Sequence, residues 1–532
     1  MNIQLARAIV TSLHRLGVQE YVVCAGGRNA PLVKVLGAAR GPQVHYFFDE
    51  RAAAFFALGR SRQQRRPVAV VTTSGTAVAE LLPATIEAHY AGVSLVLLTA
   101  DRPRSYRGSG APQAIEQAQL FGPYADLSFD IERVDEVDVL RVSSSAPTHI
   151  NVCFDEPLLD GEVPALHLEP TDFSCADRAS NGAARDGPRL HRFLSTVERP
   201  LVIVGGLPSD RKALVLDTLR RWGAAVYSEA PSGLREAAEL AAIRVSGAAA
   251  LAPASFRRHF DAVIRIGDVP TVRIWRDLED VLKDVPVLSI SDGRYSGLAR
   301  DKSRPCDYAV CAHELNDRVF APRLELQLGD RVCRQRLSDL LARLPNSEPG
   351  VVHCLSTVVP MGSLAMVGNS LPIREWDLAA TDEDRRLAVV ANRGANGIDG
   401  LVSTFLGLAR SDVENWLILG DLSALYDLSA LAFTSEVAPG AALRVVVINN
   451  RGGRVFEPMF RDKAFVNEHR FEFSSWARMF GWSYRVWDAS TPHVPTLSSV
   501  LANLPRSPTI LELRPDESAT ADFGSAHEAL EP

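Results

Sequence analysis

The stretch at residues 417–456, LILGDLSALYDLSALAFTSEVAPGAALRVVVINNRGGRVF, decides the fold of this 532-residue chain. Its apolar pattern predicts a strand at residues 416–419, an apolar helix at 425–433 and a second strand at 443–448. A strand, a crossover helix and a second strand form a parallel pair, whose strands end at the same edge of the sheet. Open α/β folds bind ligands at that edge. The stretch therefore predicts an α/β fold with a ligand site beyond these two strands.

Polar side chains follow both of these strands. Asp421 comes after the first strand and Asn450 after the second. Their oxygens suit Mg²⁺, which takes further oxygens from a bound phosphate, and Gly452 lets the backbone come close enough to offer a carbonyl. Either strand end alone is more commonly an ordinary turn, but the pair at this spacing predicts a metal site formed by Asp421, Asn450 and Gly452. Mn²⁺ accepts the same oxygens, so the sequence leaves the choice of metal open.

The composition limits the class of protein. A chain of 532 residues is too long for one core and predicts about three domains. Apolar residues make up 46% and charged residues 23%, as in globular proteins. The net charge of -7 is spread without a basic run, so nucleic acid is not an expected partner. The seven cysteines include no CxxC pair, which predicts reduced thiols rather than a zinc site or a disulfide framework.

The sequence also indicates where in the cell the protein is expected. Residues 3–16 place apolar side chains at helical spacing, without the continuous apolar core of a signal peptide. No apolar run reaches the roughly 18 residues that a membrane-spanning helix needs. We therefore expect a cytoplasmic protein that has no membrane partner.

Strands and helices alternate along the chain, which is typical of doubly wound parallel sheets. Besides the helix at 425–433, the pattern predicts helices at residues 3–16 and 77–91 and an alanine-rich helix that begins near residue 49. The remaining predicted strands are residues 21–23, 44–48, 68–72, 95–98, 201–204, 225–227, 262–266, 287–290, 365–367, 387–390 and 509–513.

Two polar stretches divide the chain. Residues 169–188 and 345–350 (PNSEPG) are expected to be linkers. The fold class predicted is α/β with three doubly wound parallel-sheet domains, at residues 1–170, 189–344 and 351–522, followed by a frayed tail at 523–532. Ligand-type strand ends occur in the first and third domains, which is consistent with a cofactor clamped between them. The central domain is interpreted mainly as structural.

Several motifs point to one family. They are FDERAAAFFALG (48–59), TTSGTAVAELLPATIEA (72–88), LLTADRP (97–103), QAIEQ (113–117), GNSLPIR (368–374), NRGANGIDGLVST (392–404), GDLSALYDLSAL (420–431) and NNRGGRVF (449–456). With these motifs, in this order, the chain resembles the thiamine diphosphate (ThDP)-dependent 2-succinyl-5-enolpyruvyl-6-hydroxy-3-cyclohexene-1-carboxylate (SEPHCHC) synthases, the MenD family. They cover both outer domains, and the central domain matches more loosely.

The resemblance implies the cofactor site. It implies pyrimidine-binding, central and diphosphate-binding domains, and active sites between the subunits of a homodimer or homotetramer. Glu50 matches the catalytic acid that hydrogen-bonds the aminopyrimidine of ThDP, although alone it would be an ordinary acid at a helix start. Asp421, Asn450 and the Gly452 carbonyl match the ligands of Mg²⁺ on the diphosphate. Further cofactor contacts are implied for Ser74, Asn396, Gly397, Ile398, Gly420, Leu422, Ser423, Val455 and Phe456.

The resemblance also implies the substrates. The family decarboxylates 2-oxoglutarate and adds the succinyl carbanion equivalent to isochorismate, a transferase reaction of menaquinone biosynthesis. Both substrates are dicarboxylates, which the planar guanidinium of arginine binds in bidentate fashion. Ser370, Arg374 and Arg393 match the site of 2-oxoglutarate. Positions that match the isochorismate site are Arg28, Arg102, Gln113 and Arg273, and Met459 matches an apolar pocket residue beside Val455 and Phe456.

The chain departs from the family pattern mainly on the acceptor side. Gly27 stands where serine is usual, Pro112 and Glu80 replace asparagines, and Asn396 replaces a serine. A missing hydroxyl contact at Gly27 weakens one substrate by about a kilocalorie or marks a different acceptor. The alternatives therefore stay open: a paralogous 2-oxoglutarate carboligase with another acceptor, a simple 2-oxo acid decarboxylase, or a non-catalytic paralogue. The sequence does not decide between dimer and tetramer, nor whether an effector binds.

Overall fold

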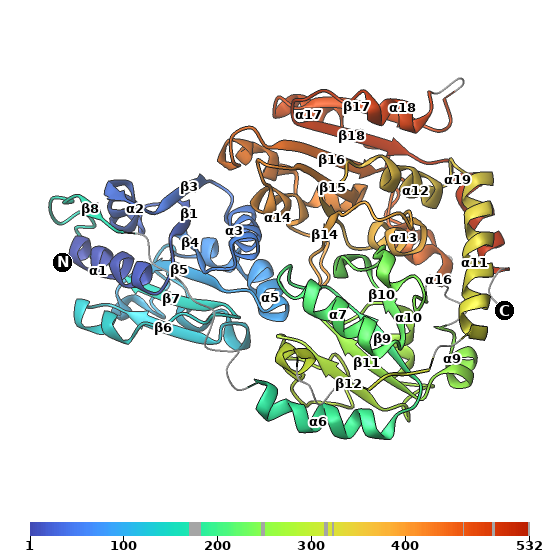
Figure 1. Cartoon of the computed structure of the whole chain (residues 1–532). Helices are drawn as coiled ribbons and strands as arrows, with labels where there is room; N and C mark the ends of the chain where they lie inside the picture. The colour runs from blue at the N-terminus through green and yellow to red at the C-terminus, as the bar shows by residue number, and fades with distance from the viewer. Residues whose placement is uncertain are drawn as a thin grey trace. The chain divides into compact units, whose positions relative to one another are not determined.

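Three parallel β-sheets form the framework of the chain (Figure 1). The structure, a computed structural model, describes residues 1–169, 182–245, 251–312, 318–321, 324–460, 462–491 and 495–529, without the side chains of 182–184, 312, 324, 458 and 459. Each sheet is built from short buried runs of Val, Ile, Leu and Ala joined by helices, the pattern of sheets covered on both faces. The α/β class with parallel sheets predicted from the sequence is confirmed.

The amino-terminal sheet has six strands in the order β3-β1-β4-β5-β7-β6. Its strands are β1 (Glu20–Cys24), β3 (Gln43–Phe47), β4 (Val68–Thr72), β5 (Leu95–Asp101), β6 (Leu127–Ile131) and β7 (Thr148–Cys153). The helices around it are α1 (Asn2–Arg15), α2 (Ala30–Ala38), α3 (Glu50–Gln64), α4 (Thr76–Ala79) and α5 (Leu82–Ala91). A separate pair joins β2 (Ala39–Arg40) to β8 (Leu166–His167). The helix predicted at 77–91 is therefore two helices, because Pro83 lacks an amide hydrogen and begins a new helix.

The central sheet has four strands in the order β10-β9-β11-β12. They are β9 (Pro200–Val204), β10 (Ala225–Ser228), β11 (Ala262–Ile266) and β12 (Val287–Ile290), within a residue or so of the predicted strands. Alternate residues of β9 pack into two different apolar clusters, so both faces of the sheet are covered. Its helices are α6 (Gly182–Thr196), α7 (Lys212–Trp222), α9 (Pro253–His259), α10 (Arg273–Asp277) and α11 (Leu324–Arg343).

The carboxy-terminal sheet has six strands in the order β14-β13-β15-β16-β18-β17. They are β13 (Leu364–Val367), β14 (Ala388–Val390), β15 (Glu414–Gly420), β16 (Ala442–Ile448), β17 (Ser483–Asp488) and β18 (Thr509–Arg514). The helices of this block are α12 (Glu348–Val358), α13 (Leu371–Ala379), α14 (Leu401–Leu408), α15 (Asp421–Tyr426), α16 (Glu457–Phe460), α17 (Ser474–Met479), α18 (Leu497–Ala502) and α19 (Glu517–Glu528). β15 and β16 are the strands that the opening stretch predicts.

The chain divides into two compact units that do not follow its order. The first comprises Met1–Cys175, Gly394–Ala409 and Leu425–Gly440, and the second comprises Ala176–Arg393, Arg410–Ala424 and Ala441–Pro532. Helix α14 thus belongs to the same unit as α3, and the two helices pack backbone to backbone. A Cβ on Gly59 would lie 2.3 Å from the Thr404 carbonyl oxygen, and one on Gly407 would lie 2.3 Å from that of Phe56. Two glycines therefore allow the close packing of α3 and α14.

Besides the helix at 77–91 and the linker at 345–350, inside which α12 begins at Glu348, three predicted segments differ from the structure. Helix α6 begins at Gly182, inside the linker expected at 169–188, of which residues 170–181 lie outside the described part. The frayed tail predicted at 523–532 is wrong for residues 523–528, because α19 runs from Glu517 to Glu528 and buries Phe523 beside α11 (Figure 1). Residues 530–532 lie outside the described part. The helix predicted at 425–433 is the end of α15 followed by the 3-10 helix η10 (Leu428–Glu436). The chain turns between them at Asp427, whose buried carboxylate accepts hydrogen bonds from Ser403.

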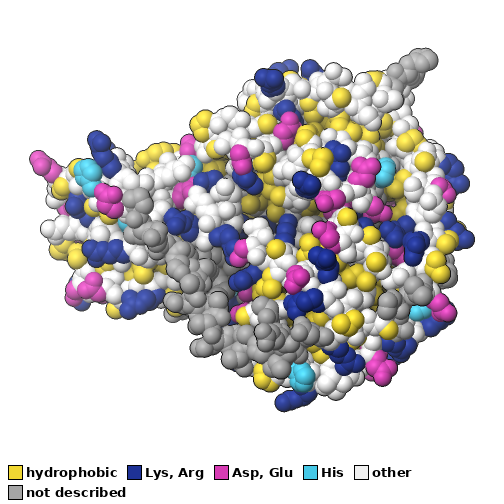
Figure 2. Space-filling view, in the orientation of Figure 1, with side chains coloured by type: hydrophobic (Ala, Val, Ile, Leu, Met, Phe, Trp, Pro, Cys, Tyr) yellow, Lys and Arg dark blue, Asp and Glu magenta, His cyan; other side chains and the backbone are white. Residues whose placement is uncertain are grey.

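The face drawn in Figure 2 shows no strong segregation of charge among the described residues. In Figure 2, basic and acidic side chains are interspersed over the visible face, in keeping with the small net charge of -7. Among the described residues, no helix is both long and apolar enough to cross a membrane.

Candidate active site

Asp421 lies directly after β15, as predicted. β15 and β16 pair in register up to Gly420 and Ile448, so the segments that follow them share one edge of the sheet. Asp421 is 2% exposed. Its Oδ1 accepts a hydrogen bond from the Leu422 amide at 2.6 Å, and its Oδ2 accepts one from the Gly452 amide at 2.9 Å. These bonds fix the carboxyl group, and burial raises its pKa.

A histidine that the sequence analysis did not single out faces this carboxylate. His469 Nε2 lies 3.1 Å from Asp421 Oδ2. Its Nδ1 accepts a hydrogen bond from the Phe471 amide at 3.2 Å, which leaves the ring proton on Nε2. The imidazole opposes the rise in the pKa of Asp421 that burial causes.

Asn450 lies after β16, with its amide nitrogen held by a second carboxyl group. Asn450 Nδ2 donates to Glu348 Oε1 at 3.0 Å and to Glu348 Oε2 at 2.9 Å. Asn450 Oδ1 is buried and has no hydrogen-bond partner among the described residues. Burial raises the pKa of Glu348 to about 7, and the pKa of the neighbouring Glu375 is raised further by burial and by Glu348. One carboxamide oxygen is therefore free beside a cluster of carboxyl groups.

Gly452 occupies a position that only glycine fits. Its φ is +142°, and a Cβ there would lie 2.5 Å from the Val466 carbonyl oxygen. Its amide already donates to Asp421. The loop after β16 is thereby tied against the end of β15, as a site built from both strand ends requires.

The donors present fit a divalent cation. Asp421 and Asn450 offer oxygens of the kind that Mg²⁺ and Mn²⁺ accept. A buried polar atom without a partner is rare in folded proteins and marks the place of an ion or a water molecule, and Asn450 Oδ1 is such an atom. The residues predicted as metal ligands are therefore brought together, and they fit the group.

The predicted 2-oxoglutarate residues lie at the ends of β13 and β14. Arg374, on α13, donates to the Ser370 carbonyl at 2.7 Å, and Arg393 donates to Asn369 Oδ1 at 2.8 Å. Ser370 has a φ of +73°, a strained conformation of the kind that gathers at functional sites. Burial lowers the pKa of Arg374, and the charges of Arg393 and Arg276 lower it further. The structure therefore gathers three guanidinium groups here, of which the sequence analysis named two.

Two buried carboxyl groups adjoin this arginine cluster of Arg276, Arg374 and Arg393. The pKa of Asp377 is raised to about 7 by burial and by the charge of Glu229. Glu229 accepts hydrogen bonds from Thr271 at 2.7 Å and from the Val272 amide at 3.1 Å, which anchors the start of α10. With both acids weakened by burial, the cluster keeps an excess of positive charge for an anionic ligand.

The remaining predicted residues of this unit range from buried to exposed. The Arg273 side chain is 86% exposed, with an ion pair to Asp277 at 3.9 Å. Phe456 is 44% exposed, and its ring centroid lies 6.1 Å from that of Phe460. Leu422 and Val455 are half-buried, Ser423 is buried, and a Cβ on Gly420 would meet open space. The side chain of Met459 lies outside the described part of the chain.

Glu50 is the first residue of α3, in the other unit. The helix is capped by Asp49, whose Oδ1 accepts from the Ala52 amide at 3.0 Å. Glu50 is half-buried, and burial raises its pKa. The charges of Asp49 and Glu80 raise it further. A raised pKa makes this carboxyl group easier to protonate, which is the property that a catalytic acid needs.

Ser74 and Gln113 lie near each other at the edge of the amino-terminal sheet. Ser74 is buried at the end of β4, and a Cβ on Gly75 would lie 3.3 Å from Gln113 Cα. Gln113 is exposed and has a φ of +57°. The buried Gln117 holds this turn, since its Oε1 accepts from the Gly75 amide at 3.2 Å and its Nε2 donates to the Ala100 carbonyl at 2.9 Å.

Arg28 is fixed at the same edge. Its guanidinium donates to the Phe154 carbonyl at 3.0 Å and lies 3.3 Å from Glu156. Its amide donates to Thr73 Oγ1 at 3.1 Å, which joins the ends of β1 and β4. A Cβ on the adjacent Gly27 would meet nothing within 4 Å.

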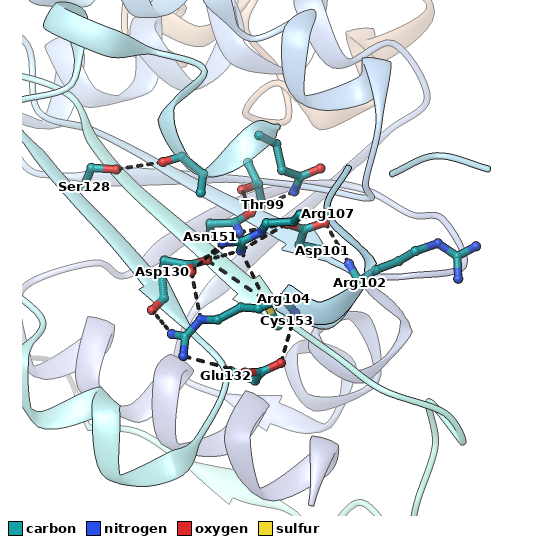
Figure 3. A network of polar contacts seen from close by, with 12 residues as sticks. Thr99, Asp101, Arg102, Arg104, Arg107, Ser128, Asp130, Glu132, Asn151 and Cys153 are labelled. Atoms are coloured by element: carbon teal, nitrogen blue, oxygen red, sulfur yellow. Dashed lines mark hydrogen bonds and ion pairs between the residues drawn. The ribbon is translucent and has the colours of Figure 1, made fainter. Parts of the chain in front are cut away.

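A polar network positions the loop of Arg102 (Figure 3). The Arg102 amide donates to Asp101 Oδ1 at 2.8 Å, while its side chain extends away from the network and donates to the Pro112 carbonyl at 3.1 Å. Arg107 donates to Asp130 at 2.6 Å, and Asn151 bridges Asp130 and Asp101 at 2.8 and 3.0 Å. This partly buried network therefore holds the backbone at Arg102 and leaves the Arg102 side chain outside the network (Figure 3).

The loop before α14 is held by a carboxylate on α5. Glu87 accepts hydrogen bonds from the Gly394 amide at 2.8 Å and the Ala395 amide at 2.7 Å. The next residue, Asn396, is exposed and has a φ of +60°. Gly397 and Ile398 follow, and both are half-buried. This loop and Glu50 thus belong to one compact unit.

Four residues in these contacts were not anticipated: Glu87, Arg276, Glu348 and His469. Ser347-Glu348-Pro349 is a recognisable helix start inside the stretch interpreted as a linker, so this signal could have revealed α12. The other three carry no local signal, because their roles arise from contacts distant in sequence.

Comparisons with known proteins agree with this geometry. The sequence model described as "Thiamine pyrophosphate enzyme, N-terminal TPP binding domain" matches residues 3–120. The 2-succinyl-5-enolpyruvyl-6-hydroxy-3-cyclohexene-1-carboxylate synthase of Bdellovibrio bacteriovorus is 41% identical, over 99% of both chains. Proteins of the same name are 39% identical in Akkermansia muciniphila, over 95% of this chain and 94% of that one, and 32% identical in Geobacillus kaustophilus, over 86% and 85%.

Fold, site and sequence match therefore define a thiamine diphosphate-dependent enzyme. The relatives narrow the assignment: the chain belongs to the SEPHCHC synthase family.

Proposed function

We propose that this enzyme decarboxylates 2-oxoglutarate and adds the resulting succinyl group to isochorismate, the SEPHCHC synthase reaction of menaquinone biosynthesis. The full-length match to synthases of that name supports the overall reaction. The observation that carries the proposal is the arginine cluster, which lies at the carboxyl edge of the same sheet that carries Asp421 and Asn450. A decarboxylase that acts on a dicarboxylate needs cationic groups for the distal carboxylate, and the charge of these three arginines supports that role.

The chain's own residues would hold the cofactor and the metal. Asp421, Asn450 Oδ1 and the Gly452 carbonyl would bind Mg²⁺, or Mn²⁺ in its place, against the diphosphate. When bound, ThDP supplies the reactive carbanion and the electron sink. Glu50 would hold a proton at the aminopyrimidine nitrogen, a role that its raised pKa favours. The other proposed cofactor contacts are Ser74, Asn396, Gly397, Ile398, Gly420, Leu422, Ser423, Val455 and Phe456.

Arginine side chains would supply most of the substrate contacts. Ser370, Arg374 and Arg393 would bind the distal carboxylate of 2-oxoglutarate, and we add Arg276 because its charge acts on Arg374. The isochorismate contacts are proposed to be Arg28, Arg102, Gln113 and Arg273, with Met459 in the apolar lining.

The setting of the reaction is part of the proposal. We propose a cytoplasmic homodimer or homotetramer whose active sites lie between subunits. The alternative of a related acceptor in place of isochorismate rests on the sequence at Gly27, where the serine hydroxyl usual in the family is absent.

The test is the rate of CO₂ release from 2-oxoglutarate with ThDP and Mg²⁺, with and without isochorismate. A synthase releases CO₂ rapidly only when isochorismate is present. Release that is slow with or without isochorismate would direct the search to another acceptor. Fast release without an acceptor would identify a simple decarboxylase, and no release would contradict the assignment of Ser370, Arg374 and Arg393.

A further inference from the structure

Two adjacent asparagines after β16 have opposite hydrogen-bonding states. Asn449 is fully engaged: its Nδ2 donates to Glu512 Oε1 at 2.8 Å and to the Phe471 carbonyl at 3.0 Å, and its Oδ1 accepts from the Arg451 amide at 3.2 Å. Asn450 is engaged only on its nitrogen side, by Glu348. The Asn450 oxygen is buried without a partner among the described residues. One asparagine is therefore structural, and its neighbour presents a free oxygen.

We propose that Glu348 is a positioning residue that sets the orientation of the Asn450 carboxamide and thereby the affinity of the divalent cation. This rests on the metal site proposed above. Both carboxyl oxygens of Glu348 lie within 3.0 Å of Asn450 Nδ2, a group that only donates, so the nitrogen of the amide faces Glu348 and the oxygen faces away. The opposite orientation would place Asn450 Oδ1 about 3 Å from two carboxylate oxygens, where oxygen lone pairs repel. Glu348 thus selects the orientation in which the oxygen is available to the metal.

Glu348 is itself held rigidly. It is 3% exposed and is the first residue of α12, which is capped by the buried Ser347. Its amide donates to Thr520 Oγ1 on α19 at 3.0 Å. A Cβ on Gly350 would lie 2.5 Å from the Leu344 carbonyl oxygen, so the backbone packs closely at this turn. A rigid helix start can fix the rotation of a ligand that lies on a loop.

Glu348 also lies near the second metal ligand. The charge of Asp421 acts on Glu348, and Gly452 joins the Asn450 loop to Asp421 through its amide. Glu348, Asn450 and Asp421 therefore form one polar neighbourhood. Residues behind metal ligands commonly change metal affinity by about 10–100-fold when mutated.

The experiment measures the dissociation constant of Mg²⁺ at saturating ThDP, read from the change in intrinsic tryptophan fluorescence as metal is added. We expect E348Q to weaken Mg²⁺ binding about tenfold or more, because the glutamine amide can also donate and permits the Asn450 amide to turn over. The matched control is E512Q, which alters the buried acid behind Asn449. It should bind Mg²⁺ within about threefold of the wild type, because neither Glu512 nor Asn449 faces the metal.

A reciprocal exchange separates orientation from simple packing. N450D places two carboxyl groups face to face and should weaken Mg²⁺ binding strongly. In E348Q/N450D the glutamine can donate to one oxygen of the aspartate and leave the other aspartate oxygen for the metal, so Mg²⁺ affinity should recover relative to N450D.

Equal Mg²⁺ affinity in E348Q and the wild type, or additive losses in the double variant, would overturn the proposal. If E348Q does not fold, E348D is the substitute variant. Its side chain is shorter by one methylene, which moves the carboxylate away from Asn450 Nδ2, so it should also weaken Mg²⁺ binding. If the wild-type protein binds ThDP but its fluorescence does not change when Mg²⁺ is added, the proposed metal site is wrong.

Discussion

Glu50 shows how neighbouring charges tune a single catalytic group. Burial raises its pKa, and the acidic side chains of Asp49 and Glu80 add to the effect. Glu80 is also one of the positions where the chain departs from the family pattern. The charged residue at position 80, where the family has a neutral one, therefore raises the pKa of Glu50, the proposed proton carrier. The motif alone did not predict this effect.

Substitution E80Q should lower the pKa of Glu50, because it removes a negative charge that disfavours ionisation. If the protonated carboxyl group is the active form, activity is lost as pH rises through that pKa. The alkaline limb of the pH profile of kcat/KM should then move to lower pH in E80Q. The measurement is the pH dependence of CO₂ release, and an unmoved or upward-shifted limb would contradict this account.

Arg276 and Arg273 lie one turn apart on α10, and the structure predicts different roles for them in donor binding. R276M should raise KM for 2-oxoglutarate about tenfold or more, since a hydrogen bond to a charged group contributes roughly 1.5–3 kcal/mol. R273M is the matched control and should leave KM for 2-oxoglutarate unchanged, because Arg273 pairs with Asp277, whereas the charge of Arg276 acts on Arg374. Equal effects of the two substitutions on this KM would show that the cluster of Arg276, Arg374 and Arg393 is not the donor site.

Gly27 offers a direct test of the acceptor side. A Cβ there meets nothing within 4 Å, so G27S should fold with an unchanged Tm. If isochorismate is the acceptor, the restored hydroxyl should lower its KM several-fold, since a neutral hydrogen bond contributes about 0.5–1.5 kcal/mol. Steady-state kinetics with varied isochorismate give the result. An unaltered KM and acceptor preference would mean that the glycine does not determine which acceptor is used.

At the scale of elements, the packing of α3 on α14 depends on small residues. These helices are distant in sequence but belong to one compact unit, and they connect Glu50 with the loop at 394–400. A side chain larger than hydrogen at Gly407 would press against the Phe56 carbonyl. The position of the catalytic acid relative to this loop therefore depends on backbone contact between two helices.

Substitution G407A should destabilise the protein by about 1–3 kcal/mol, the usual cost of overpacking a close contact. Gly329 on α11 is the matched control, because a Cβ there meets nothing within 4 Å. G329A should raise stability slightly, by about 0.5–1 kcal/mol, since alanine favours a helix. Thermal unfolding of the two variants gives the comparison, and similar Tm shifts would contradict the packing argument.

The sequence predicts best the elements whose signal is local. Continuous apolar runs such as those of β4 and β11 give strand bounds that match the structure. β7 was missed because its buried polar residues hide the pattern: His149 and Asn151 lie inside and bond with Thr99. β6 and β17 were missed because they are edge strands with exposed positions.

The residues of the candidate site show the same contrast between local signals and tertiary packing. Asp421 and Asn450 were predicted because each ends a strand, and parallel pairing brings such ends together. Glu348 and Arg276 were not predicted, because they lie on α12 and α10 and come to the site only through tertiary packing. No spacing along the chain encodes that packing.

At the scale of the whole molecule, the chain is two compact units whose bounds cross the order of the sequence. Segments Gly394–Ala409 and Leu425–Gly440 leave the carboxy-terminal block and pack in the amino-terminal unit, as α14 on α3 illustrates. The three domains expected at 1–170, 189–344 and 351–522 therefore stay a proposal. The candidate metal ligands lie in the second unit, and Glu50 lies in the first.

The most direct test of the account is the mass of the product formed from uniformly ¹³C-labelled 2-oxoglutarate and unlabelled isochorismate with ThDP and Mg²⁺. The account predicts labelled CO₂ and an adduct of isochorismate that carries the four remaining labelled carbons. Labelled succinic semialdehyde as the sole product, with isochorismate recovered intact, would contradict it.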